Sequence, residues 1–170
     1  VDCAMTRMAR LIATFGGVGY LRPAPGTWGS LAALPLAWVL HLIGGFPLMV
    51  LAAAAVFAEG IWATNVVTRG SDNHDPSEIV IDEVAGQLIA LLPLSYSAWS
   101  MGLEILRLWP GWIAAFVLFR LFDITKPWLV GWADRREDAL GVMLDDVIAG
   151  VFAAVGVVIL AALWHGVLGL

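Results

Sequence analysis

The sequence has few of the residues on which soluble and disulfide-linked domains depend. Charged residues make up 14% of its 170 residues, whereas a typical soluble domain has about 25%. Cys3 is the only cysteine, which excludes an internal disulfide framework and a thiolate metal site. The net charge is −5 and no basic run occurs. We therefore expect no nucleic-acid partner.

Apolar residues dominate instead. They make up 61% of the chain, and the mean hydropathy is +0.87. A soluble domain of this length could not bury so much apolar surface in one core, whereas a bilayer accommodates it. Residues 1–20 lack the basic-then-apolar pattern of a signal peptide, so we expect the spanning helices themselves to target the chain. We predict one membrane-embedded domain over residues 1–170.

Stretches without Asp, Glu, Lys or Arg mark the predicted membrane helices. They cover residues 23–58, 84–103, 108–119 and 147–170. A spanning helix needs about 20 apolar residues, so the first stretch is too long for one crossing. Gly44, Gly45 and Pro47 divide it, which predicts helices at about 30–43 and 47–68. The sequence thus predicts an all-α integral membrane bundle of about five transmembrane helices.

Five crossings put three polar segments on the same side of the membrane. Segments 1–27, 69–83 and 120–146 contain every Lys and Arg except Arg107. Because basic loops stay in the cytoplasm, we predict that this side is cytoplasmic. A last helix near 141–168 would then leave the C-terminus outside. Tryptophans near the helix ends are expected to form an interfacial belt.

The first acidic group lies at the start of the third predicted crossing. Asp75, Pro76 and Glu78 fit an N-cap, a first helical position and a capping-box acid, which predicts that the helix begins there. Asp82 and Glu83 follow in the same predicted helix. Small residues after Asp82 predict a close-packed face inside the bundle. A carboxylate on such a face needs a cation.

The last predicted helix repeats this pattern. Asp145 and Asp146 precede Ala149 and Gly150, so Asp146 also lies on a close-packing face. Acids in the first turn of a helix can simply stabilise its dipole, but two adjacent like charges repel each other. A divalent cation would remove that repulsion. Mg²⁺ takes oxygen ligands from carboxylates, water and substrate phosphates.

A third polar group follows the fourth predicted crossing. Arg120, Asp123 and Lys126 are spaced by three residues and would be neighbours on a helix, although Pro127 disfavours helix at Lys126. An ion-paired helix end is one interpretation. The alternative is that Asp123 binds a metal while Arg120 and Lys126 bind a phosphate group.

A turn rich in proline and glycine precedes the first crossing on the same side. Thr27 or Ser30 could cap the helix that follows. The uncapped N-terminus of such a helix could instead bind an anion.

Four stretches together resemble the phosphatidylglycerophosphatase A family of bacterial inner-membrane lipid phosphatases. They are GYLRPAPGTWGSL (19–31), DPSEIVIDEVAGQ (75–87), FRLFDITKP (119–127) and GVMLDDVIAG (141–150). The resemblance implies magnesium-dependent removal of the terminal phosphate of phosphatidylglycerophosphate at the cytoplasmic face of the inner membrane. Two departures concern loop shape: Leu129 stands where the family usually has a second proline, and residues 138–141 are less glycine-rich.

The resemblance and the residue chemistry together define the expected site. The expected Mg²⁺ ligands are Asp82, Glu83, Asp123, Asp145 and Asp146. The expected phosphate-binding residues are Thr27, Arg120 and Lys126, and the expected supporting residues are Asp75, Glu78 and Asp134. The expected catalytic residues are Asp123, Arg120 and Lys126. Attack by water with Asp123 as general base is the favoured route, and an aspartyl-phosphate intermediate is the alternative.

Two other functions are compatible with the pattern. Carboxylates within membrane helices also mark ion paths, so a cation transporter or channel is one alternative. The acids gather at one face, with only Glu104 and Glu59 elsewhere, which favours a surface site over a path. A metal-dependent phosphatase acting on another phospholipid monoester is the other alternative.

Overall fold

The chain folds into helices, as the sequence predicts. The computed structural model describes residues 3–71 and 73–168, and no strand occurs among them. The α-helices are α1 (Cys3–Ala13), α2 (Pro25–Thr68), α3 (Ile81–Ala90), α4 (Leu92–Met101), α5 (Trp109–Thr125), α6 (Leu129–Asp134) and α7 (Ala139–Leu168). Two short 3₁₀ helices, Val18–Tyr20 and Ile105–Leu108, join α1 to α2 and α4 to α5.

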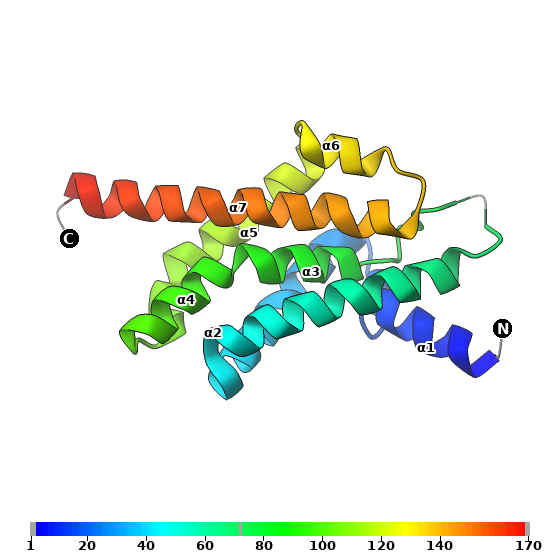
Figure 1. Cartoon of the computed structure of the whole chain (residues 1–170), viewed down its shortest axis with the longest axis horizontal. Coiled ribbons are helices and arrows are strands. Elements are labelled where there is room, and N and C mark those ends of the chain that lie inside the picture. Colours follow the sequence, from blue (N-terminus) through cyan, green and yellow to red (C-terminus); the bar gives the residue numbers. More distant parts are fainter. Residues whose placement is uncertain (1–2, 72, 169–170) are drawn as a thin grey trace.

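Helix α2 consists of two arms that run side by side in opposite directions (Figure 1). They meet at Gly45, whose backbone is not helical (φ 60°, ψ −152°). This region favours glycine, and a Cβ here would also lie 2.5 Å from the Trp99 ring. The predicted break is confirmed. The first arm begins at Pro25 rather than near residue 30.

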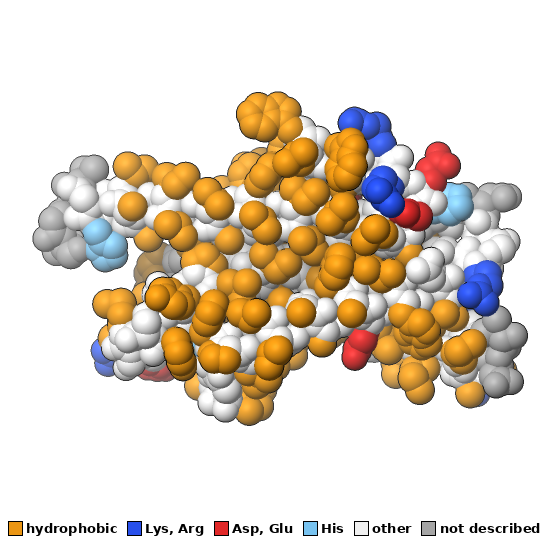
Figure 2. Space-filling model, viewed as in Figure 1, with side chains coloured by type: hydrophobic (Ala, Val, Ile, Leu, Met, Phe, Trp, Pro, Cys, Tyr) orange, Lys and Arg blue, Asp and Glu red, His pale blue; other side chains and the backbone are white. Residues whose placement is uncertain are grey.

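The long helices can cross a membrane. Within the described residues, Pro25–Thr68, Ile105–Thr125 and Ala139–Gly166 are long and apolar enough, by length and composition alone. Helix α3 runs beside α7, and α4 continues from α3 and diverges from α7 (Figure 1). With the two arms of α2, the bundle has the predicted arrangement of about five passes. Large apolar side chains cover much of its outer surface (Figure 2).

The two ends of the bundle differ in the chain segments that they contain. The N-terminus, the α2–α3 loop, α6 and the start of α7 lie at one end (Figure 1). The turn at Gly45, the α4–α5 connection and the C-terminus lie at the other end. The three polar segments that the crossing count put on one side are therefore together, and we call this the polar end.

Close contact between α3 and α7 forms the centre of the bundle. A Cβ on Gly150 would overlap the carbonyl oxygen of Gly86, and a Cβ on Gly86 would lie 2.5 Å from the carbonyl oxygen of Asp146. Small residues allow two membrane helices to approach this closely. Asp82 and Asp146 are both buried at this contact, which confirms the predicted close-packed faces.

The predicted capping box is wrong. Helix α3 begins at Ile81, so Asp75 and Glu78 precede it and neither caps it. The backbone N–H of Val80 donates to the carbonyl of Ala13 instead, at 2.9 Å. This bond joins segments far apart in the sequence and ties the approach to α3 to the end of α1. Local sequence alone does not reveal such a partner.

The predicted cap at the start of α2 is also wrong. Helix α2 has Ala24 at its N-cap position and no side-chain cap. The Ser30 hydroxyl donates to the carbonyl of Gly26 at 2.9 Å, and Thr27 makes no capping bond. Because proline has no N–H, Pro25 at the first helical position removes one of the donors that a cap would satisfy.

Candidate active site

A polar cavity of about 350 Å³ opens at the polar end of the bundle. The first turn of α2, the loop before α3, and parts of α3, α5 and α7 form its walls. Its lining includes eight of the predicted site residues: Asp75, Asp82, Glu83, Arg120, Asp123, Lys126, Asp145 and Asp146. Binding sites for small molecules have volumes of roughly 300–1,000 Å³, so the cavity can accept a phosphate headgroup.

Three carboxylates meet at the inner wall of this cavity. Asp82, Glu83 and Asp146, here called the inner triad, each offer an oxygen within 4.8 Å of the others. Asp82 is 7% exposed and Asp146 2% exposed. Asp82 Oδ1 and Glu83 Oε2 are buried without a hydrogen-bond partner among the described residues. Buried carboxylates without partners are costly, so this geometry suits a cation.

Two backbone contacts bring the inner triad together. The approach of α3 to α7 at Gly86 and Gly150 brings Asp82 and Asp146 into the same space. Glu83 lies against Gly26 at the start of α2, where a Cβ would overlap its carboxylate and lie 3.2 Å from Arg120 Nη1. The site therefore requires a residue without a side chain at position 26, and glycine is that residue.

Asp123, Asp134 and Asp145 have basic partners. Arg120 forms an ion pair with Asp123. Lys126 Nζ forms ion pairs with Asp134 and with Asp145, the latter at 2.9 Å. We call these contacts the outer pairs. Arg120 Nε is buried and has no partner among the described residues. The guanidinium therefore keeps an N–H group that could donate a hydrogen bond to a phosphate oxygen.

Lys126 lies just beyond the end of α5. The helix ends at Thr125, which confirms the effect expected of Pro127. Lys126 has a left-handed backbone (φ 46°), and its side chain contacts acids on α6 and α7 instead of stacking beside Arg120 along the helix. Arg120 and Asp123 are therefore neighbours as expected, whereas Lys126 contacts other acids and shares only the cavity lining with them.

Charges around the cavity mouth shift two pKa values. Burial opposes the charge of Lys126, but bonds to Asp134 and Asp145 outweigh it and raise the pKa of the ammonium group above its usual value. Desolvation raises the pKa of Asp75 at the mouth; Lys126 opposes this rise, and Asp134 and Asp123 add to it. Lys126 is therefore a permanent cation at neutral pH.

The structure divides the predicted site residues into groups. The inner triad contains three of the five predicted metal ligands, whereas Asp123 and Asp145 belong to the outer pairs. Thr27 and Glu78 are not among the residues that line the cavity. Asp134 joins the site through Lys126. The two acids expected elsewhere, Glu59 and Glu104, also lie outside the cavity.

Two residues were not predicted: Gly26 in the cavity lining, and Gln87, which lies outside the lining in the same helix as Glu83. Gly26 lines the cavity, and its only sequence signal was its place in the turn rich in proline and glycine. Gln87 is fully buried, and both its amide atoms lack partners among the described residues. It lies one turn after Glu83 in α3. Its signal was a polar residue within an otherwise apolar stretch.

Fold and site together define a helical membrane protein with a polar cavity suited to a cation and a phosphate group. The sequence profile of phosphatidylglycerophosphatase A matches residues 11–161, and the chain belongs to that family. It is accordingly a phosphoric monoester hydrolase.

Curated relatives support this assignment. The chain is 36% identical over 147 residues to phosphatidylglycerophosphatase A of Haemophilus influenzae, covering 85% of this chain and 83% of the relative. It is 34% identical over 152 residues to phosphatidylglycerophosphatase A of Escherichia coli, covering 88% and 81%. A Bacteroides thetaiotaomicron protein, provisionally named a phosphatidylinositol-3-phosphatase, is 37% identical over 147 residues, covering 84% and 87%. No solved structure matches the chain.

Proposed function

We propose that this protein hydrolyses phosphatidylglycerophosphate to phosphatidylglycerol and phosphate, with Mg²⁺, at the cytoplasmic face of a bacterial inner membrane. The observation that carries the proposal is one cavity lined both by Asp82 and Glu83, each with an unpartnered carboxylate oxygen, and by Arg120, whose buried Nε has no partner among the described residues. A phosphate monoester is a dianion and needs positive charge around it. The names of the two phosphatidylglycerophosphatase A relatives support the choice of substrate.

The inner triad supports a bound cation. Asp82, Glu83 and Asp146 would hold Mg²⁺, because each offers an oxygen close enough to share one ion, and Asp82 Oδ1 and Glu83 Oε2 have no hydrogen-bond partner among the described residues. Oxygen ligands are those that Mg²⁺ prefers. When bound, the ion would neutralise charge on the phosphoryl group and make water a better nucleophile.

The basic residues would bind the phosphate. Arg120, oriented by its ion pair with Asp123, would donate to phosphoryl oxygens through the nitrogen that has no partner. Lys126 would add a positive charge next to Asp145. Donors already oriented toward the position where charge develops lower the barrier most. The ion pairs with Asp123, Asp134 and Asp145 thus hold the Arg120 and Lys126 side chains in place before the substrate binds.

The proposed reaction transfers the phosphoryl group to water. The water oxygen forms a bond to phosphorus, and the bond from phosphorus to the glycerol oxygen breaks. The proton lost by water passes to Asp123, the proposed general base, and from there to solvent, while the glycerol oxygen takes up a proton from solvent. The products are phosphatidylglycerol and inorganic phosphate. The acyl chains can remain in the lipid, because the cavity is open at the end of the bundle.

Reconstituted protein tests this proposal directly. We expect purified protein in vesicles to release phosphate from phosphatidylglycerophosphate in the presence of Mg²⁺. We expect this release to stop when the metal is chelated. Phosphatidylinositol 3-phosphate serves as the competing substrate. A larger kcat/KM on that lipid would contradict the proposed substrate, and release unaffected by chelation would contradict the metal. Rapid acid quenching that traps a phosphorylated aspartate would contradict the water route.

Tags test the proposed orientation. Reporters at residues 70 and 135 should both report the cytoplasm, and one at residue 105 the periplasm, because the first two positions lie at the polar end and the third at the other end (Figure 1). A periplasmic signal from residues 70 and 135 would contradict the cytoplasmic site. Opposite signals from these two positions would contradict the arrangement of the bundle itself.

A further inference from the structure

Helix α1 has an apolar face that the bundle does not cover. Ala9 and Ala13 are fully buried against the rest of the molecule. Met5, Met8 and Leu11 point away from it, with 38%, 59% and 61% of their surfaces exposed. Helical spacing puts these three side chains on neighbouring positions around α1. An exposed apolar face of this kind marks a surface that contacts a protein or a membrane.

The charge on α1 indicates which of these partners fits. Arg7 and Arg10 are its only charged residues, and both are exposed. At about 100° per residue they lie together on the side of the helix away from Ala9 and Met5. Helix α1 is therefore apolar on one side and cationic on the other. Amphipathic cationic helices bind the surface of anionic membranes.

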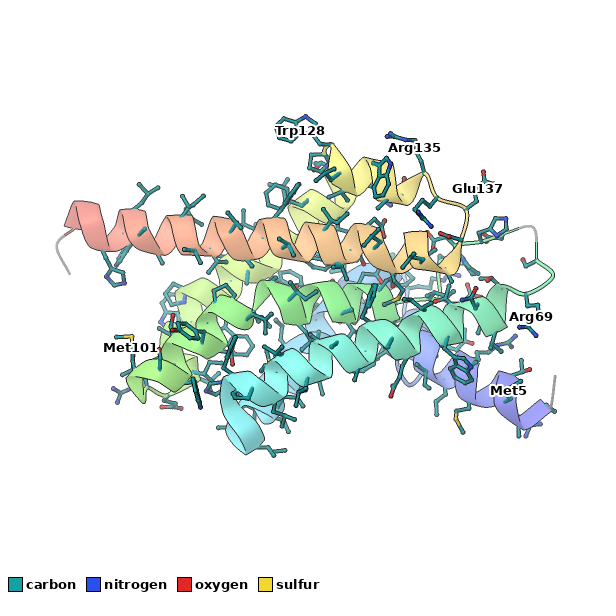
Figure 3. The ribbon with its side chains drawn as sticks, viewed as in Figure 1. Met5, Arg69, Met101, Trp128, Arg135 and Glu137 are labelled. Carbon is teal, nitrogen blue, oxygen red and sulfur yellow. The ribbon has the colours of Figure 1, made fainter. Side chains whose placement is uncertain are left out.

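The position of α1 agrees with a membrane surface. It lies at the polar end, where the apolar outer surface of the bundle gives way to charged loops (Figures 1 and 2). Helix α6 lies at the opposite edge of the molecule in this view, and the segment 128–135 around it also carries exposed apolar side chains next to an arginine (Figures 1 and 3). Trp128 and Trp132 of this segment are 89% and 50% exposed, and Arg135 follows them. Aromatic residues favour the headgroup level of a bilayer.

We propose that α1 lies in the headgroup layer of an anionic phospholipid membrane. Met5, Met8 and Leu11 insert among the upper acyl chains, and Arg7 and Arg10 contact lipid phosphates. Because the Ala13 carbonyl accepts a hydrogen bond from Val80 just before α3, the depth of α1 also sets the depth of the cavity. Helix α6 also lies in the headgroup layer, at the other edge of the molecule, and the ion pair of its Asp134 with Lys126 connects it to the cavity.

Fluorescence from single cysteines tests this proposal without reference to enzyme activity. Cys3 is the only cysteine, so Cys3→Ser provides a background for Met8→Cys, Leu11→Cys and the control Arg10→Cys, whose side chain lies well away from both around the helix. Each variant carries an environment-sensitive fluorophore and is reconstituted as the full chain in vesicles containing phosphatidylglycerol. Lipids with a quencher near the top of the acyl chain should quench the labels at positions 8 and 11 several-fold more than the label at position 10.

Equal quenching at the three positions would overturn the proposal, because α1 would then have no membrane-facing side. Blue-shifted emission that appears only at high protein-to-lipid ratio would overturn it too, since a second copy of the chain would then cover the helix. In the Leu11→Cys background, Arg7→Gln with Arg10→Gln should remove the difference in emission between vesicles with and without phosphatidylglycerol. An unchanged difference would exclude the proposed role of the two arginines.

Discussion

Asp145 and Asp146 are neighbours in the sequence, yet their carboxyl groups have different surroundings. Asp145 accepts hydrogen bonds from Lys126 and from the backbone N–H of Asp146. Asp146 instead faces Asp82 and Glu83, with no basic partner among the described residues. Successive helical residues differ by about 100° around the axis, so one side chain points toward Lys126 in the turn after α5 and the other toward α3.

The outer pairs and the inner triad should therefore contribute differently to the stability of the fold. A paired carboxylate can stabilise the fold, whereas an unpaired buried carboxylate costs free energy. The inner triad is therefore the part of the site where replacement should lower activity and raise the stability of the metal-free protein. Replacing a residue of an outer pair should instead lower the stability of the protein, because its charged partner is then left unpaired.

Asp82→Asn should have the largest effect. It keeps the shape of the side chain but removes a charge from the inner triad, so we expect kcat to fall by roughly 10³-fold, since metal-assisted charge stabilisation contributes several kcal/mol. In chelator the variant should unfold at a higher temperature than the native chain. Phosphate release and thermal unfolding measure the two effects. Glu137→Gln, an exposed acid at the same end (Figure 3), is the matched control, and full activity of Asp82→Asn would refute the role of the triad.

Arg120→Ala tests the outer pairs. We expect kcat to fall by roughly 10²-fold, the usual cost of losing one donor to the transition state. Removing the guanidinium also leaves Asp123 unpaired, so the variant should unfold at a lower temperature, unlike Asp82→Asn. The exposed Arg135→Ala is the control (Figure 3). A rise in KM with unchanged kcat would limit Arg120 to binding the substrate.

Gly26→Ala tests the contact between the two parts of the site. The added Cβ would displace the Glu83 carboxylate on one side and the Arg120 guanidinium on the other. We expect kcat/KM to fall roughly tenfold with little loss of stability, because small displacements of reacting groups are costly. Gly166→Ala, where a Cβ meets no atom within 4 Å, is the control. Equal activity of the two variants would show that the inner triad tolerates movement.

Asp138→Ala should have the smallest effect and should leave the reaction unchanged. Asp138 caps α7 by accepting from the Gly141 N–H at 2.8 Å, and it also pairs with Arg136 at 2.8 Å. We expect the free energy of unfolding to fall by about 1 kcal/mol, the usual worth of an N-cap. Glu137→Ala, at the neighbouring position, should change it less.

The same cap predicts a dependence on pH. The bond to Arg136, with help from the Gly141 N–H, lowers the pKa of Asp138 in the folded protein. Its contribution is therefore complete above the ordinary carboxyl pKa and is lost as the pH falls through the lowered value. Denaturation of the native chain and of Asp138→Ala should accordingly converge in acid. A stability gap that is constant with pH would contradict this assignment.

Local properties of the sequence determined the architecture of this protein. The length of the apolar stretches fixes how many helices can cross a bilayer, and glycine fixes the turn at Gly45 because its backbone tolerates positive φ. Crossing parity then gathers the acids and the basic residues at one end. Periodicity also identified Asp82 and Asp146 as inward-facing, because small residues follow each of them at helical spacing.

Only the tertiary structure decided which of these charges have partners. The bond from Val80 to Ala13 sets the start of α3 at Ile81, and so leaves Asp75 and Glu78 outside the helix. The turn after α5 directs Lys126 to Asp145 rather than back along its own helix. These contacts join residues distant in the sequence, whereas helix propensity and hydrophobic period depend on near neighbours. The division between inner triad and outer pairs therefore exists only once α3, α5 and α7 are packed together.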